Sequence, residues 1–137
     1  MADYNEFPFE TEICEHLEAN GWNYSRNSEG YDRERALFPD DLIGWLAETQ
    51  PNELAKVVDL NGPNFTKQRD QLLDRLVKTL DTPMESGGGT LNVLRRGFKH
   101  VSAKFQMCQF KPETGLNPTD GERYTKVRVR VMRQVYF

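Results

Sequence analysis

The chain has 137 residues, 37% of them hydrophobic and 28% charged, with a net charge of -3 and a mean hydropathy of -0.73. This is enough for one domain with a single hydrophobic core. No run approaches the roughly 18 apolar residues of a membrane span, and the acidic start MADYNEFPFETE does not match a secretory signal. These features exclude a membrane-embedded or signal-bearing chain, and we expect a cytoplasmic protein.

The first two-thirds of the sequence predicts helices. Phe9, Ile13 and Leu17 recur four residues apart, which indicates one face of a helix. Thr11 is a candidate N-cap for this helix, and Gly21 stands where a helix commonly ends.

Two further helical segments and one long helix are expected next. A second helix is capped at Asp40 or Asp41 and ends at Pro51, and a short third helix begins at Asn52. Thr66 precedes the clearest helix, which a proline closes. Its apolar stripe consists of Leu72, Leu73, Leu76, Val77 and Leu80.

Beyond the glycine-rich connection Met84–Thr90 and a helical turn at Leu91–Arg95, the apolar period changes to two. Phe105–Phe110 alternates, and Tyr124–Met132 (YTKVRVRVM) alternates strictly, which is typical of half-buried antiparallel strands. The turn-forming residues of Lys111–Glu122 predict a long hairpin loop. Helices followed by strands favour an α+β fold with N-terminal helices packed on an antiparallel or mixed sheet.

The charge is distributed unevenly along the expected single domain, residues 1–137. Residues 1–94, mostly helical, carry 8 basic and 18 acidic residues, whereas residues 95–137, which hold the expected strands, carry 10 basic and 3 acidic residues. Such asymmetry is a hint of nucleic-acid contact. A solvated basic face paired with the acidic half is the alternative explanation.

Four cationic residues near the C-terminus are the candidate DNA-binding residues. Lys126, Arg128 and Arg130 alternate along one face of the expected last strand, and Arg133 follows it. Such a row of charge can follow a phosphate backbone, since phosphate contacts supply sequence-independent affinity. Solubilising residues on an exposed sheet face would give the same pattern.

Other motifs give no complete catalytic site. The glycines before Thr90 lack the lysine of a Walker A loop, which favours a hinge over a nucleotide site. His16 and His100 have no second ligand at metal spacing. Cys14 and Cys108 form neither a disulfide framework nor a metal motif and indicate reduced thiols.

Four segments together resemble the start of the restriction (R) subunit of type I restriction-modification enzymes. The most specific segment is Gly89–Pro118, which shows a VL-x-x-G turn, a strand ending in aromatic-x-Pro, and an Asn-Pro loop. The resemblance covers nearly the whole chain in order. The segments are Phe9–Trp22 (FETEICEHLEANGW), Asp32–Val57, Gly89–Pro118 and Tyr124–Phe137, the last of which closes in an Arg-Gln-x-x-Phe/Tyr pattern.

The resemblance implies part of a PD-(D/E)xK nuclease domain, an α/β core with a mixed sheet flanked by helices. In that family the R subunit cleaves unmodified DNA with Mg²⁺, and its motor domains hydrolyse ATP. It acts in a complex with modification and specificity subunits. Glu10 matches an acidic residue on the family's first helix that often supports the metal site. A surface carboxylate near a helix N-terminus is the alternative reading of Glu10.

The family's metal-binding Asp and Glu-x-Lys follow the Arg-Gln strand, and neither they nor the ATP-binding motor occur in this sequence. We therefore expect this chain alone to lack cleavage activity, with Mg²⁺ and ATP used by the intact enzyme. Two other hypotheses stay open. One is a non-catalytic docking or regulatory module that binds a restriction complex or DNA through an open strand edge. The other is a small DNA-binding protein, which the net charge of -3 disfavours.

Overall fold

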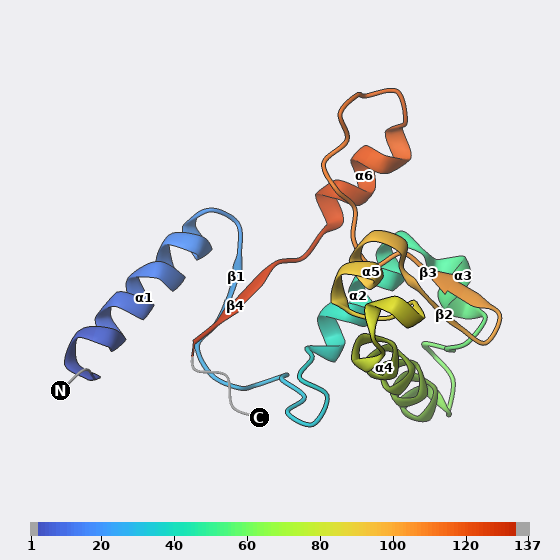
Figure 1. Ribbon diagram of the computed structural model, residues 1–137, viewed down its shortest axis with the longest axis horizontal. Helices are drawn as coiled ribbons and strands as arrows, with labels where there is room; N and C mark the ends of the chain where they lie inside the picture. Colours follow the sequence, from blue (N-terminus) through green and yellow to red (C-terminus); the bar gives the residue numbers. More distant parts are fainter. Residues whose placement is uncertain (1–2, 134–137) are drawn as a thin grey trace. The chain divides into compact units, whose positions relative to one another are not determined.

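The computed structural model describes the backbone of residues 3–133 and the side chains of residues 8–133. Helices make up 51% and strands 11%, which confirms the expected mixed α+β class. The chain forms two compact units (Figure 1). Unit 1 consists of Met1–Phe38 and Arg128–Phe137, and unit 2 consists of Pro39–Val127.

Unit 1 is a helix on a small parallel sheet. Helix α1 (Asp3–Ala19) is followed by strand β1 (Asn23–Ser25), and strand β4 (Arg130–Met132) pairs with β1 in parallel. Tyr24 lies opposite Val131 in this register. Helix α1 contacts both strands, so that a segment near residue 130 is held beside the first helix.

The first helix begins earlier than the sequence analysis expected. It starts at Asp3 and contains Pro8, so Thr11 lies inside the helix and the expected N-cap at Thr11 is wrong. Its end was predicted correctly. Gly21 adopts a φ of 97°, in the left-handed region that glycine enters without strain, and the chain turns there toward β1.

The face of α1 that is covered also differs from the expected one. Phe9 and Ile13 are 62% and 44% exposed, whereas Cys14 is 3% exposed. Among residues 8–19 the covered positions are Glu10, Thr11, Cys14 and Leu17. They share one side of the helix, because residues three and four positions apart lie above one another. The stripe of Phe9, Ile13 and Leu17 is therefore not the buried face.

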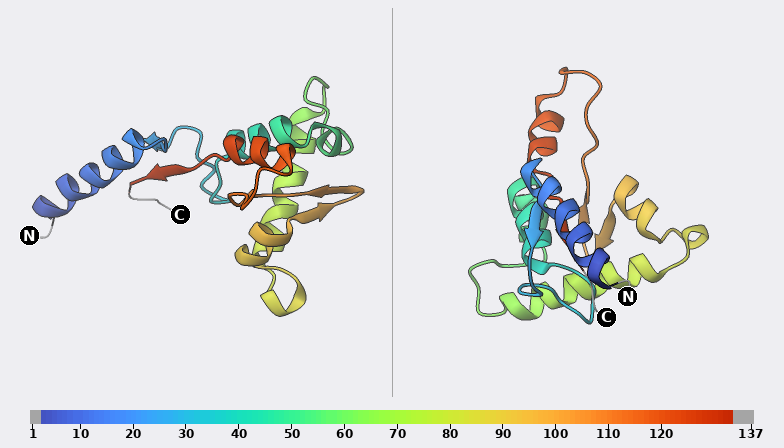
Figure 2. Two further views of the ribbon diagram at one scale, coloured as in Figure 1. Left: turned by 90° about the horizontal axis from the view of Figure 1, so that it is seen from above. Right: turned by 90° about the vertical axis from the view of Figure 1, so that its left-hand side faces the viewer.

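In unit 2, helices pack against a two-stranded hairpin (Figure 2). The three helices expected between residues 40 and 83 are present, but each begins one to three residues earlier than expected. Asp40 and Asp41 lie in the first turn of their helix and are not its N-cap, and Thr66 lies inside its helix. The elements in chain order are α2 (Pro39–Thr49), α3 (Pro51–Ala55), α4 (Phe65–Asp81), the short 3-10 helix η1 (Met84–Ser86), α5 (Thr90–Arg96), β2 (Phe98–His100), β3 (Ala103–Phe105) and α6 (Pro118–Lys126).

The hydrophobic core lies in unit 2. Of the twelve apolar side chains buried among residues 8–133, eleven belong to unit 2, and Cys14 is the remaining one. Burial of apolar area is the main favourable term in folding, so unit 2 holds most of the stabilisation. The eleven are Trp45, Leu46, Leu54, Val58, Leu72, Leu73, Leu76, Val93, Phe98, Ala103 and Phe105.

A glycine allows the hairpin to lie against the end of α5. Strands β2 and β3 are antiparallel, with Phe98 opposite Phe105 and their rings 5.5 Å apart. Gly97 ends α5 with a φ of 75°, and a Cβ at this position would lie 1.8 Å from the carbonyl oxygen of Phe105. Gly97 is therefore required both by its backbone conformation and by the close approach of β3.

The expected strand Phe105–Phe110 is wrong beyond its first residue. The N–H of Gln106 donates to Gln50 Oε1 at 2.6 Å, and its carbonyl accepts from Gln50 Nε2 at 2.7 Å and from Trp45 Nε1 at 2.9 Å. Side chains thus take both backbone groups of Gln106. The ladder between β2 and β3 cannot continue, and β3 ends at Phe105.

The expected strand Tyr124–Met132 is also wrong. Residues up to Lys126 belong to α6, and only Arg130–Met132 form a strand, which pairs with β1 and not with β3. Asn117 caps α6 by accepting the N–H of Thr119 at 3.1 Å, with Pro118 at the first helical turn. The end of the expected Arg-Gln strand, residues 134–137, lies outside the described residues.

A pair of leucine substitutions tests the position of the core. Leu73 is fully buried and Leu116 is 89% exposed. We expect Leu73→Ala to lower the free energy of unfolding by about 2–5 kcal/mol, because it removes transfer energy and leaves a cavity. Leu116→Ala should change it by less than about 0.5 kcal/mol. Urea unfolding followed by circular dichroism measures both, and equal losses would contradict the assigned core.

Candidate functional site

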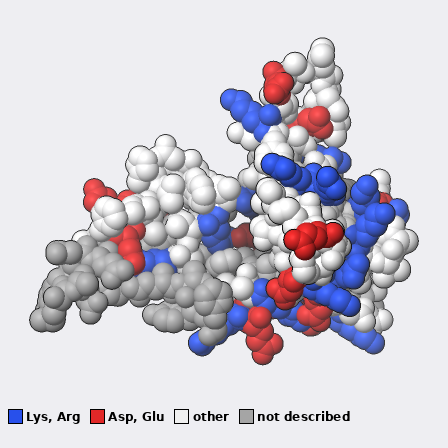
Figure 3. Space-filling view, viewed as in Figure 1, with Lys and Arg blue, Asp and Glu red and all other residues white. Residues whose placement is uncertain are grey.

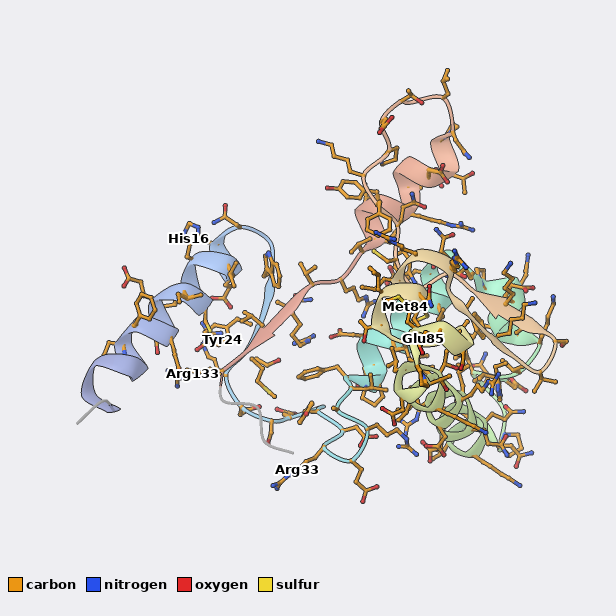
Figure 4. All side chains as sticks on the ribbon, viewed as in Figure 1. His16, Tyr24, Arg33, Met84, Glu85 and Arg133 are labelled. Atoms are coloured by element: carbon orange, nitrogen blue, oxygen red, sulfur yellow. The ribbon has the colours of Figure 1, made fainter. Side chains whose placement is uncertain are left out.

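The candidate metal-site residue and one candidate DNA-binding residue meet in unit 1. Arg133 follows β4 and reaches α1, where its Nη1 donates to Thr11 Oγ1 (Figure 4). Its Nε lies 3.9 Å from Glu10 Oε2, and the two side chains are 28% and 27% exposed. Among the described side chains, none donates a hydrogen bond to this buried Glu10 oxygen. The carboxylate is therefore held near a cation but keeps an acceptor position open.

Arg130 is part of the framework of unit 1. Its Nη1 donates to Ser25 Oγ at 2.8 Å, and its guanidinium carbon lies 4.9 Å from the centre of the Phe38 ring. The first contact joins β4 to β1, and the second is a cation–π contact with the end of the loop that follows β1. Arg128 precedes β4 and is exposed.

The predicted row of cations is not formed. Lys126 is an exposed residue in the last turn of helix α6 in unit 2, whereas Arg128, Arg130 and Arg133 belong to unit 1. The alternation that placed these side chains on one strand face requires a strand over the whole segment, and the helix replaces its first part. Contact of each cation with DNA stays a prediction, but a continuous row along one strand is ruled out.

A cavity of about 440 Å³ lies at the end of β4. Three arginines and a tyrosine line it. Figure 4 shows two of these arginines, Arg33 on the loop after β1 and Arg133 beside α1. Such donors suit an anionic ligand. The lining residues are Arg26, Asn27, Ser28, Tyr31, Arg33, Met132 and Arg133.

Acidic residues hold the arginines of this loop in place. Arg26 donates to both Glu18 oxygens, at 3.1 and 2.9 Å, and lies 4.4 Å from the centre of the Tyr24 ring. The hydrogen bond from Arg26 lowers the pKa of Glu18. In the same way, the hydrogen bond from Arg35 lowers the pKa of Asp32. These pairs order the loop and reduce the net positive charge around the cavity.

The Tyr31 hydroxyl is the polar group of this cavity that lacks a protein partner among residues 8–133. It is buried, and its ring packs against Phe38 with 5.3 Å between ring centres. Burying a hydroxyl without a hydrogen bond costs free energy, about 1–3 kcal/mol on mutational scales. A ligand oxygen in the cavity would relieve that cost.

The described residues do not by themselves fit a Mg²⁺ ion. Magnesium prefers several oxygen ligands, and within residues 8–133 no group of three or more His, Cys, Asp or Glu side chains could hold a metal. Glu10 lies beside the positive charge of Arg133, so it could support a metal ion only together with further ligands from outside the described residues.

No histidine or cysteine is among the residues that line this cavity. His16 is exposed on α1, Cys14 is buried on the covered face of the same helix, and Cys108 is half-buried in unit 2. His100 ends β2, where desolvation and, second, the positive charge of Arg75 lower its pKa.

No family model, curated protein or solved structure matches this chain. None of the helices in residues 3–133 is long and apolar enough to cross a membrane.

The loop residues of the cavity were missed by the sequence analysis. Arg26, Tyr31 and Arg33 belong to a polar loop with no recognised motif, and they reach Arg133 because β1 pairs with a strand more than one hundred residues later. Local periodicity carries no signal for such a pairing. The density of arginine between residues 26 and 35 was the available hint.

A double-mutant cycle tests the contact between Glu10 and Arg133. We expect Glu10→Gln and Arg133→Gln to show a coupling free energy of about 0.5–1 kcal/mol, as is found for partly exposed ion pairs. Amide hydrogen exchange of α1 measures it for the wild type, the two single variants and the double variant. Glu12→Gln, an exposed carboxylate on the same helix, should be additive with Arg133→Gln. If the coupling free energy between Glu10 and Arg133 were no larger than that between Glu12 and Arg133, the contact would be contradicted.

Proposed function

We propose that this chain is the N-terminal part of the R subunit of a type I restriction enzyme, within its endonuclease domain. The proposal rests on the sequence resemblance and on one structural observation. The parallel pairing of β1 with β4 brings Arg133, at the end of the segment that resembles the Arg-Gln strand, to Glu10 on the first helix. The resemblance singled out Glu10 as a functional residue, and the pattern of basic residues singled out Arg133.

The build of unit 1 supports the same proposal. Parallel sheets are normally covered on both faces, and a two-stranded sheet is marginally stable on its own. Here each strand has three residues, and one apolar side chain, Cys14, is buried among residues 8–38 and 128–133. Unit 1 thus has the character of the first layer of an α/β sheet that gains stability when further strands are added. A PD-(D/E)xK core is a mixed sheet flanked by helices.

In this proposal the residues of unit 1 bind and orient DNA. The arginines of the cavity contact phosphate oxygens, and Glu10 supports a metal site whose main ligands, an Asp and a Glu-x-Lys, come from outside the 137 residues. Mg²⁺ and ATP are used by the intact enzyme, which includes modification and specificity subunits and acts on unmodified DNA in the cytoplasm. This chain alone does not cleave.

Plasmid cleavage tests the proposal. We expect the purified chain with Mg²⁺ to leave a supercoiled plasmid intact, and a form extended by the next roughly 60 encoded residues, enough for several further strands, to nick it. In the extended form Glu10→Gln should lower the rate about tenfold or more, since it removes a charge that supports the metal. Glu12→Gln should not.

Each outcome of this assay decides between hypotheses. Cleavage by the 137-residue chain itself would overturn the proposal. If neither form cuts, and the chain instead binds a purified complex of modification and specificity subunits, the docking-module hypothesis replaces it. In that case the unpaired edge of a short parallel sheet is the surface that a partner strand would extend.

The candidate DNA contacts are tested by salt dependence. We expect Lys126→Gln, Arg128→Gln and Arg130→Gln each to weaken duplex binding equally for all sequences, and to reduce the slope of log K against log salt by about one. Lys67→Gln, an exposed cation on α4, is the matched control and should leave the slope unchanged. Unchanged slopes for all three variants would remove these residues from the DNA interface.

A further inference from the structure

Unit 2 contains a second basic cavity that the sequence resemblance does not assign. Its volume is about 310 Å³, near the lower end of the range of ligand sites. Four cations and one carboxylate line it. Figure 3 shows the Lys and Arg side chains on one face of the molecule, with Asp and Glu side chains among them. The lining residues are Gln50, Glu53, Arg95, Arg96, Lys104, Phe105, Gln106 and Arg123.

The cavity is built on the buried core. Gln50 is 8% exposed, and its side-chain amide forms hydrogen bonds with both the N–H and the carbonyl of Gln106. The indole N–H of Trp45 donates a third hydrogen bond, to the same carbonyl. The side chain of Gln106 then accepts a hydrogen bond from Arg123 Nη1 at 2.6 Å. A chain of hydrogen bonds from the core therefore fixes the guanidinium of Arg123 at the cavity, which an exposed surface arginine would not achieve.

The four cations at this cavity are not paired with a carboxylate. Among the side chains of residues 8–133, no carboxylate forms an ion pair with any of them. Arg123 is half-buried, and its Nε is buried without a hydrogen bond to any described residue. Because its described partner is the neutral side chain of Gln106, an anion in the cavity would stabilise its charge. The four cations are Arg95, Arg96, Lys104 and Arg123.

The single carboxylate does not neutralise them. Glu53 pairs with Lys56, which lies outside the cavity, at 2.5 Å, and its other oxygen accepts the backbone N–H of Lys104 at 3.1 Å. The hydrogen bond from Lys56 is the main reason that the pKa of Glu53 is lowered. Glu53 therefore stays ionised but already serves another cation.

A purely structural reason explains part of this cluster. Arg95 and Arg96 lie in the last turn of α5, where cations interact favourably with the helix dipole. Arg123 lies in the last turn of α6, so the same effect applies to it. It does not explain Lys104, which comes from β3, or why the ends of two helices and a strand bring their cations to one cavity. Three different elements direct cations to one cavity, which is the arrangement expected of an anion site.

We propose that this cavity binds a phosphate group. Arginine presents several N–H donors in a fixed fork that matches phosphate oxygens, and three arginines with one lysine suit a group of high charge density better than a single carboxylate. The phosphate belongs either to a nucleic-acid backbone or to a free phosphate ester. The proposal needs no metal and concerns unit 2, so it stands independently of the proposed nuclease function of unit 1.

A titration of the full chain, followed by its backbone amide NMR signals, tests the proposal. The probes are inorganic phosphate and a short DNA duplex, at matched ionic strength with chloride as the reference. We expect saturable shifts at Lys104, Gln106 and Arg123 with at least one probe. If duplex binding is the tighter and phosphate competes with it, the source is a nucleic-acid backbone. If phosphate binds and the duplex does not compete, the source is a free phosphate ester.

Two variants and a control make the test decisive. Arg123→Gln should weaken binding about three- to tenfold, and because it also removes a contact to Gln106, Arg95→Gln with Arg96→Gln is the second variant. Both arginines of the second variant are exposed, so the fold is retained. Lys67→Gln should bind like the wild type. The proposal would be overturned if the NMR shifts did not saturate with either probe. It would also be overturned if all variants bound the probes with the same affinity as the wild type. Failure of the extended form to nick plasmid DNA would contradict the nuclease proposal and would not affect this one.

Discussion

Two hydrogen bonds between the Gln50 amide and the backbone of Gln106 determine much of unit 2. They join the end of α2 to the residue after β3, and they end the hairpin ladder at that point. Because the same residue then orients Arg123, a buried polar contact sets the geometry of a surface cavity. If the Gln50 amide or the backbone of Gln106 were buried without a hydrogen bond, the cost in free energy would exceed what these bonds contribute. The contact therefore also favours one packing of the helices against the hairpin.

Local patterns predicted the helices of unit 2 and failed for the strands. The apolar stripe of α4 and the two aspartates near the start of α2 are short-range signals, and both helices form, although the aspartates lie in the first turn of α2 and not at its cap. Helix α6 also had a local signal, an asparagine cap before Pro118, but the alternation of Val127, Val129 and Val131 outweighed it in the sequence analysis. Alternation shows only that side chains fit an extended backbone, and it does not identify the partner strand.

The candidate site shows the same limit. Glu10 was identified by resemblance and Arg133 by the pattern of basic residues, and their contact depends on β1 pairing with a strand more than one hundred residues later. The charge division near residue 95 did not predict the two units either, because the basic residues after it are shared between both. Lys126 and Arg128 are neighbours in the sequence but belong to different units. Arg26 and Arg33, from an early loop, line one cavity together with Arg133.

The two basic cavities differ in how their charges are balanced, and this difference separates their roles. Around the cavity of unit 1, Glu18 and Glu10 lie beside Arg26 and Arg133, and those pairs also join the loop and β4 to α1. In unit 2 the cations stand on three packed elements without acidic partners among the described side chains. In unit 1 the ion pairs of Arg26 and Arg133 also help to hold a small sheet together, since its described residues bury little apolar surface. Unit 2 has the core to support unpaired cations, and those cations are available to an anionic ligand.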